Sequence, residues 1–416
     1  MTIAIAFETA EVAAAALLLP LSAAMLSPWP GHSPSRDKRI DWLRGLAMVC
    51  VIVDHSRRSS LLSWFSYQRL WVVTAAEVFV VLSGIVLGMV YGARLMRYGI
   101  VPMTTRLLRR AGLLYFSFIA VTLSVLGLAL IGVDTSAVAT WDPSAMTWFL
   151  DPRTMTAANW QDLALLRFGP WPFEIIALYV CLVLVAVPCL IALRVAGWRA
   201  VLAASWAVYG WYWLSPRGVT GAEFEVTFPL LAWQLLFVHG IVIGYHRDHL
   251  AALAARCPRP LSIAVAATSV GFMAFALSNP SATGPGFLRW RLVSPEAFSA
   301  LYERYFSLSD LGLGRLLNLA VALPTGYAVL AWRRLSVVIT PLQELLATLG
   351  QRSLAAFVLH VYGLILLAHL PDSDQLWTNT LMQILLIGGI AAVLGWRRAP
   401  GSAKELVPRR ADPIAA

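Results

Sequence analysis

Apolar segments of nearly constant length recur along most of the chain. About ten of them follow residue 39, each close to the roughly 20 residues that a helix needs to cross the hydrocarbon core of a bilayer. They lie at 40–61, 70–91, 111–133, 172–195, 198–214, 226–245, 261–278, 315–332, 353–370 and 377–396. Because backbone polar groups in lipid must be satisfied within their own segment, such stretches fold as helices. We therefore expect an all-α polytopic integral membrane protein with about ten transmembrane helices.

The composition also favours a membrane protein over a soluble one. Of 416 residues, 59% are hydrophobic and 13% are charged, whereas soluble chains average roughly 45–50% apolar and about 25% charged. The net charge of +10 does not indicate nucleic acid binding, because the basic residues gather in particular loops. The four cysteines have neither disulfide nor metal-site spacing, so we expect no metal ion. They are Cys50, Cys181, Cys189 and Cys257.

The chain divides into one large unit with two flanking segments. We expect an N-terminal extension and linker over 1–38, a transmembrane domain over 39–400 and a cytoplasmic tail over 401–416. Whether residues 10–25 form an additional membrane helix is left open, since this apolar stretch contains Pro20. No Lys or Arg precedes it, so we do not expect a secretory signal.

Basic residues gather in alternate loops, which indicates how the chain is oriented. They include Arg94, Arg97, Arg106, Arg109, Arg110, Arg194, Arg199, Arg247, Arg256, Arg259, Arg333 and Arg334. By the positive-inside rule these loops face the cytoplasm, with Arg44 near the inner surface and His55 toward the outer half of the membrane. Many tryptophans lie near predicted span ends, as expected of an interfacial belt. Trp148, Trp160 and Trp171, in or beside an outer loop, could also stack on sugar rings.

Four ionisable residues lie within or beside the first two apolar segments: Asp41, Arg44, His55 and Glu77. A charge inside hydrocarbon is costly, so such groups usually face a partner or a water-filled cavity. Arg44 and His55 are 11 positions apart, which is about 20° around a helix and roughly 16 Å along its axis. Asp41 precedes Arg44 by three positions and falls on the same side. We expect one helix face to carry all three groups, turned toward a hydrated hollow.

The motifs around these residues resemble those of a known family. Segment 39–46 reads Arg-Ile-Asp-Trp-Leu-Arg-Gly-Leu, Asp54-His55 follows, and segment 76–84 reads Ala-Glu-Val-Phe-Val-Val-Leu-Ser-Gly. Together they resemble the OpgC branch of acyltransferase family 3, whose first helix carries an arginine, ten residues and a histidine. The resemblance implies a bacterial inner-membrane O-acyltransferase without a permanently bound cofactor. Its donor would be a cytoplasmic acyl-CoA, with succinyl as one candidate acyl group, and its acceptor a hydroxyl of a periplasmic or cell-surface glycan, as in osmoregulated periplasmic glucans.

Acyl transfer suggests a role for each ionisable residue. An acceptor hydroxyl becomes a good nucleophile when its proton is taken, and an imidazole suits this task. We therefore take His55 as the candidate general base, with a covalent acyl-histidine as the alternative. Arg44 would bind a phosphate or carboxylate of the donor, and Asp41 would hold Arg44. Glu77 needs a buried partner, for which we expect Arg44 or His55. With the nucleotide of coenzyme A near Arg44, the thioester at the end of the pantetheine arm could reach His55.

Three later stretches, 228–237, 311–319 and 350–354, also resemble OpgC-type segments. These stretches and the second-span motif supply candidate substrate-binding residues, which with Arg44 are Ser83, Trp233, Gln234 and Arg315. Gly84 and Gly88, spaced as Gly-x3-Gly, also favour close packing of two helices.

The resemblance is incomplete in one of these stretches. The family more often has a histidine where Asn318 stands, and a lysine just upstream, where Ser307 and Ser309 lie. The departure leaves the acyl group open, since a missing cation is compatible with a donor other than succinyl. Two further histidines in apolar spans, His239 and His360, are interpreted as packing residues, and His360 is chosen as a mutational control.

Two other functional classes fit the same intramembrane charges. A transporter or flippase of a glycan or small anion would use them as a substrate or proton relay, but we see no inverted repeat. A non-catalytic sensor or scaffold should tolerate the loss of His55. The oligomeric state and the identity of the acceptor are left open.

Overall fold

The computed structural model describes residues 37–139, 155–281, 289–330, 340–371 and 374–395, and within these ranges it contains helices and no strand. The long helices are α2 (Lys38–His55), α4 (Ala75–Tyr98), α5 (Ile100–Leu130), α8 (Ile175–Val195), α9 (Gly197–Leu214), α11 (Leu230–Tyr245), α13 (Arg259–Leu277), α15 (Leu313–Leu330), α17 (Thr340–Gln351), α18 (Ser353–Ala368) and α19 (Leu376–Val393). Shorter ones are α3 (Tyr67–Leu70), α6 (Ser136–Ala139), α7 (Ala157–Ala164), α10 (Phe224–Thr227), α12 (Arg247–Ala255) and α14 (Pro295–Tyr305). The segment 10–25, the tail 401–416 and Trp148 lie outside the described residues.

Among the described residues, five helices are long and apolar enough to cross a membrane, as expected of an all-α membrane protein. They are Ala75–Tyr98, Ile100–Leu130, Trp171–Val195, Arg259–Leu277 and Leu376–Val393. A sixth span is formed if α17 and α18 are counted together across a bend of 94°. The expected number of about ten spans is not confirmed, because several predicted segments form helices that are shorter or less apolar. The predicted segment 40–61, for example, leaves the helix after His55, and Arg57 then takes a φ of 53°.

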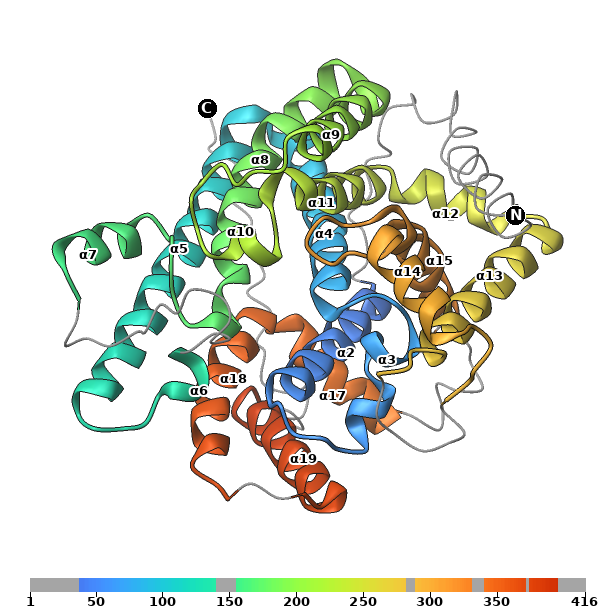
Figure 1. Ribbon diagram of the computed structural model, residues 1–416. Coiled ribbons are helices and arrows are strands. Elements are labelled where there is room, and N and C mark those ends of the chain that lie inside the picture. The colour runs from blue at the N-terminus through green and yellow to red at the C-terminus, as the bar shows by residue number, and fades with distance from the viewer. Residues whose placement is uncertain (1–36, 140–154, 282–288, 331–339, 372–373, 396–416) are drawn as a thin grey trace, which may run out of the picture.

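Helix α2 lies at the centre of the bundle. It contacts α4 as well as α15, α17, α18 and α19 from the far end of the chain. Figure 1 shows α2 in the middle, with α5 and α8 on one side, α13 to α15 on the other, and α18 and α19 beneath. A residue on α2 can therefore meet partners that are more than 300 positions away in the sequence.

The first residue of the described chain anchors the start of α2. Asp37 is the N-cap, and its carboxylate accepts hydrogen bonds from the Arg39 backbone (3.0 Å) and side chain (3.0 and 3.1 Å) and from the Tyr327 hydroxyl (2.6 Å). Burial alone would raise the pKa of Asp37, but these hydrogen bonds outweigh it and lower the pKa. The start of α2 is thus fastened to α15.

Helices α4 and α11 pack closely against each other along their length. A Cβ added at Gly84 of α4 would clash with the carbonyl of Phe237, and one added at Gly240 of α11 would clash with the carbonyl of Val81. Gly88 of α4 stands in the same situation one turn further on, against Ile241. The predicted close packing at the Gly-x3-Gly motif is therefore confirmed, since only glycine lets the two backbones approach so closely.

Candidate functional site

Arg44 and His55 both contact α18. The Arg44 guanidinium donates a hydrogen bond from Nη2 to the Ser353 hydroxyl (2.6 Å), at the start of α18. The His55 ring Nδ1 lies 3.0 Å from Nε2 of His360, two turns further along α18. The prediction that the guanidinium and the imidazole share one side of α2 is confirmed, because both side chains meet the same helix.

The Arg44 end of this side forms a small basic pocket, which we call the inner pocket after the orientation predicted from the loop charges. It has a volume of about 50 Å³, and its lining includes Arg44, Ser83, Arg110, Tyr179 and Ser353. Two guanidinium groups and three hydroxyl groups at one pocket match the needs of a phosphate or carboxylate, which binds several N–H and O–H donors at once. Ser83, a predicted substrate-binding residue, is thus brought together with Arg44.

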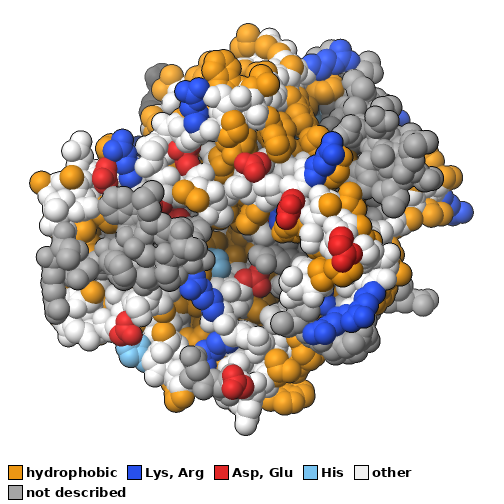
Figure 2. Space-filling model, viewed as in Figure 1, with side chains coloured by type: hydrophobic (Ala, Val, Ile, Leu, Met, Phe, Trp, Pro, Cys, Tyr) orange, Lys and Arg blue, Asp and Glu red, His pale blue; other side chains and the backbone are white. Residues whose placement is uncertain are grey.

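The His55 end of the same side opens into a larger cavity, which we call the outer cavity after the same predicted orientation. It has a volume of about 270 Å³ and is lined by His55 and Asp54 of α2, by Arg57 and Trp171, and by Thr74 before α4, among others. The Trp171 ring lies 4.8 Å from the His55 ring between centroids, and the Arg57 guanidinium lies 4.8 Å from the Trp171 centroid. In the space-filling view this side of the molecule is hollowed near its centre, where histidine, basic and acidic side chains gather (Figure 2).

One aromatic side chain belongs to both cavities. Phe357 of α18 lines the inner pocket and the outer cavity alike, and its ring packs edge-on against Phe79 of α4 at 5.4 Å between centroids. The side of α2 that carries Arg44 and His55 therefore faces two compartments that share Phe357 in their lining.

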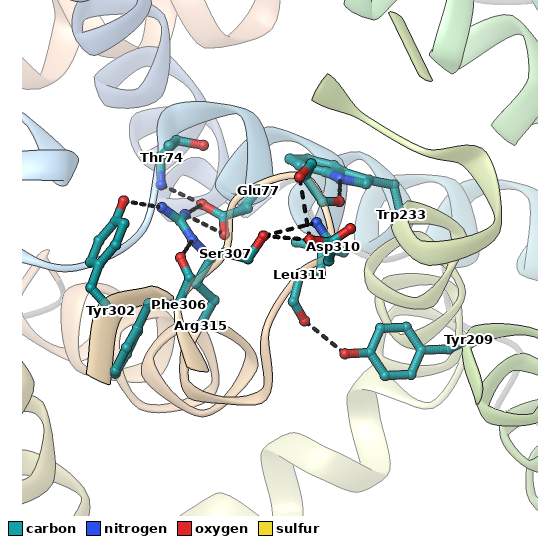
Figure 3. Close-up of polar contacts among 11 residues, drawn as sticks. Thr74, Glu77, Tyr209, Trp233, Tyr302, Phe306, Ser307, Asp310, Leu311 and Arg315 are labelled. Atoms are coloured by element: carbon teal, nitrogen blue, oxygen red, sulfur yellow. Dashed lines mark hydrogen bonds and ion pairs between the residues drawn. The ribbon is translucent and has the colours of Figure 1, made fainter. Parts of the chain in front are cut away.

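Glu77 and Arg315 form a buried ion pair near the outer cavity (Figure 3). Arg315 Nη1 lies 2.8 and 2.9 Å from the two Glu77 carboxylate oxygens, and the two side chains are 4% and 1% exposed. The Thr74 backbone N–H also donates to Glu77, and Arg315 Nε donates to the Phe306 carbonyl (2.8 Å). The expectation that Glu77 pairs with Arg44 or His55 is wrong, since α15 brings Arg315 to it instead.

Two other predicted substrate-binding residues face protein groups. Trp233 Nε1 donates to the Ser309 carbonyl (3.2 Å), as Figure 3 shows, and Gln234 exchanges hydrogen bonds with Ser205 (2.8 and 2.9 Å). Neither residue is among the described residues that line the inner pocket or the outer cavity. The contact to Ser309 helps to hold the loop before α15, from which Arg315 extends.

The remaining predicted residues lie beside these groups. Asp41 accepts a hydrogen bond from the Gln351 amide (3.3 Å), just before the bend between α17 and α18. Asn318, which stands where the family more often has a histidine, is fully buried on α15, and neither its amide N nor its amide O has a hydrogen-bond partner among the described residues. His239 of α11 contacts Trp206 and the Leu235 carbonyl and is not among the described residues that line either cavity.

Sequence reasoning missed the α18 side of the site. In the sequence, Ser353 is only part of a motif and His360 is interpreted as a packing residue. In the structure, Arg44 donates to Ser353 and His55 contacts His360. A signal was present, since Ser353 and His360 are seven positions apart and so lie on one face of a helix. Arg110 was interpreted as an orientation signal, although it lines the same pocket as Arg44.

Comparison with known protein families gives a match over most of the chain. The family model described as OpgC protein matches residues 36–399, which include α2, α4, α15 and α18. No curated protein and no solved structure gives a significant match. The match covers most of the chain, and the chain therefore belongs to the OpgC family, which at family level is a group of membrane acyltransferases that modify glucans.

Proposed function

We propose that this protein moves a small acyl group from acyl-CoA on the cytoplasmic side of a bacterial inner membrane to a hydroxyl of a periplasmic or cell-surface glycan. The observation that carries the proposal is the arrangement of Arg44 and His55 on one side of α2. Arg44 lines the inner pocket and His55 lines the outer cavity, and Phe357 lines both.

The inner pocket is the proposed donor end. Arg44 and Arg110 supply forked cationic donors, which suit the phosphates of a coenzyme A nucleotide. The hydroxyls of Ser83 and Ser353 lie in the same pocket and add neutral donors. The pantetheine arm is long and thin, so it could extend past Phe357 toward the outer cavity while the charged nucleotide stays at the inner end. Succinyl is the first acyl group to test, and acetyl is the second.

The outer cavity is the proposed acceptor end. A glycan hydroxyl attacks the thioester carbonyl as His55 takes its proton, and the thiolate of coenzyme A leaves and receives a proton in turn. The products are an O-acyl ester and free coenzyme A. Trp171 offers an aromatic face beside His55, on which a sugar ring could stack, and the Arg57 guanidinium lies against the same indole.

The test uses purified protein in sealed vesicles with radiolabelled succinyl-CoA on one side and a glucan on the other. We expect acylated glucan with wild type, a loss of about 100-fold or more with His55→Ala, and a raised donor KM with Arg44→Ala. His239→Phe is the matched control, since it removes a histidine of α11 that lines neither cavity. Glucan movement without acylation would favour a flippase instead, and full activity of His55→Ala would contradict the catalytic assignment.

A further inference from the structure

The histidine pair between α2 and α18 determines which nitrogen of each ring carries a proton. His360 is fully buried, and its Nδ1 lies 2.7 Å from the Phe357 carbonyl oxygen. A carbonyl oxygen can only accept, so Nδ1 of His360 must be the protonated nitrogen. In the neutral ring, Nε2 is then an acceptor.

The same reasoning gives the tautomer of His55. Its Nδ1 lies 3.0 Å from Nε2 of His360, which is the acceptor nitrogen, so His55 must donate from Nδ1. The neutral His55 ring then has its lone pair on Nε2. Because His55 lines the outer cavity, Nε2 is the nitrogen left for a ligand there. This is the tautomer that a general base requires.

We propose that His360 is a positioning residue that holds His55 as the Nδ1-protonated tautomer, so that Nε2 can accept the proton of the acceptor hydroxyl. This inference rests on the proposed function for its catalytic meaning. The order of groups is Phe357 carbonyl, His360, His55 and acceptor hydroxyl. When Nε2 of His55 takes a proton, Nδ1 keeps its hydrogen bond to a neutral His360, so the contact serves both charge states.

A packing role alone does not account for this geometry. What distinguishes His360 from a histidine that only fills space is its second partner, since its Nε2 contacts His55, a residue 305 positions away that lines the outer cavity. The neighbouring rings of Phe357 (5.4 Å between centroids) and His55 (5.2 Å) restrict how the imidazole can turn. The hydrogen bond from His360 to the Phe357 carbonyl of its own helix fixes the His360 tautomer independently of His55.

The activity test compares His360→Gln with His360→Phe. Glutamine keeps an acceptor near the position of Nε2, whereas phenylalanine keeps the ring volume without an acceptor. We expect kcat to fall about 100-fold or more in His360→Phe with the KM for succinyl-CoA unchanged, and to stay within about 10-fold of wild type in His360→Gln. Equal losses in both variants, or a loss through KM alone, would overturn the proposal.

His239, which is half-buried, is the matched control for a hydrogen-bonded histidine within the helical bundle. Its Nδ1 also lies 2.7 Å from a carbonyl of its own helix, that of Leu235, and its Nε2 accepts from Trp206 Nε1 (3.2 Å). It therefore shares the local contacts of His360 but does not touch His55. His239→Phe should keep wild-type kcat, and a loss equal to that of His360→Phe would show that any hydrogen-bonded histidine within the bundle is needed for structural reasons.

A second measurement does not depend on activity, and its main readout is made on the wild-type protein. The ¹⁵N side-chain resonances of His55 are assigned in wild type by their loss in His55→Ala, with the protein in lipid bilayers at neutral pH. We expect a protonated Nδ1 and an unprotonated Nε2, and a mixture of tautomers in His360→Phe. A protonated Nε2 in wild type would overturn the positioning role. The expected tautomer without any acyl transfer would keep this role and reject the proposed function.

Discussion

Glu77 and Arg315 are oppositely charged side chains that are almost fully buried and in contact, so each depends on the other. Replacing a buried ion pair with apolar residues is often tolerated, but removing one partner leaves an uncompensated charge. We expect Arg315→Met to lower the free energy of unfolding by about 3–5 kcal/mol, because Glu77 at 1% exposure would lose its counter-charge. Chemical denaturation in detergent, followed by tryptophan fluorescence, measures this effect.

The matched variant is the double substitution Glu77→Gln with Arg315→Met. It removes the orphaned charge and should regain a substantial part of the lost stability. The Thr74 backbone N–H can still donate to the glutamine oxygen. If the stability losses of the single variants Glu77→Gln and Arg315→Met added up in the double variant, the two charges would not be coupled, contrary to their 2.8 Å contact.

At the residue scale, the sequence predicted which side chains of the first two spans belong to the site, but not the distant residues that they contact. The spacing of Arg44 and His55 gave their shared side of α2, because helical periodicity is a local property. Their partners, Ser353 and His360, are 309 and 305 positions away, and Arg315 is 238 positions from Glu77. No periodicity links residues so distant, so the choice between Arg44, His55 and Arg315 as the partner of Glu77 required the packing of α15 against α4.

At the element scale, the approach of α4 to α11 depends on glycine. Gly84→Ala places a methyl group against the Phe237 carbonyl, and since backbone cannot move aside easily, the helices must separate. We expect a loss of about 1–3 kcal/mol in stability, as for other overpacked sites, measured by thermal unfolding in detergent. The matched control is Gly112→Ala in α5, where an added Cβ meets nothing within 4 Å.

Gly112→Ala should be neutral or stabilising by up to about 1 kcal/mol, because alanine is the better helix former. If both alanine variants behaved alike, the helix contact would not be the reason for glycine at position 84. The motif Gly-x3-Gly made this contact predictable from the sequence, but not which helix would be the partner.

The boundary between the two cavities is also a property of elements, since Phe357 of α18, which lines both, packs against Phe79 of α4. Phe357→Ala should open the outer cavity to the inner pocket and let water reach a bound thioester. We expect succinyl-CoA hydrolysis without any glucan to rise above the wild-type level, measured as release of free coenzyme A thiol. Phe357→Leu keeps most of the side-chain volume and is the control. Equal hydrolysis by the two variants would argue against a partition at this residue.

At the scale of the whole molecule, the composition predicted the helical membrane bundle, because burying a backbone in lipid leaves few alternatives. The number of spans was harder to predict. The hydrophobic segments around α11 and α15 form apolar helices of 10–17 residues, and the span at 353–370 joins α17 across a 94° bend. Hydropathy reports how apolar a segment is, whereas helix ends and bends follow from contacts such as Gln351 with Asp41 and Ser353 with Arg44.

The stability of the whole molecule should depend on pH through a carboxyl pair at the start of α8. Burial raises the pKa of Glu223 to about 7, although its interactions with Glu174 and with the Gly169 backbone act in the opposite direction. Between pH 4.5, its ordinary pKa, and about 7, the folded chain holds a proton that the unfolded chain has lost. This contribution to stability is complete below the ordinary pKa and is lost as the pH rises through about 7.

Glu223→Gln should remove this dependence, because an amide stays neutral at every pH. The variant should be more stable than wild type above pH 7 and should show a smaller fall in unfolding free energy between pH 5 and pH 8. Denaturant titrations in detergent at several pH values measure both effects. Thr220→Val, in the same loop, is the control, since its hydroxyl contacts Glu225 at 2.9 Å rather than Glu223, and it should leave the pH slope of wild type intact. An unchanged slope in Glu223→Gln would assign the titration to another group.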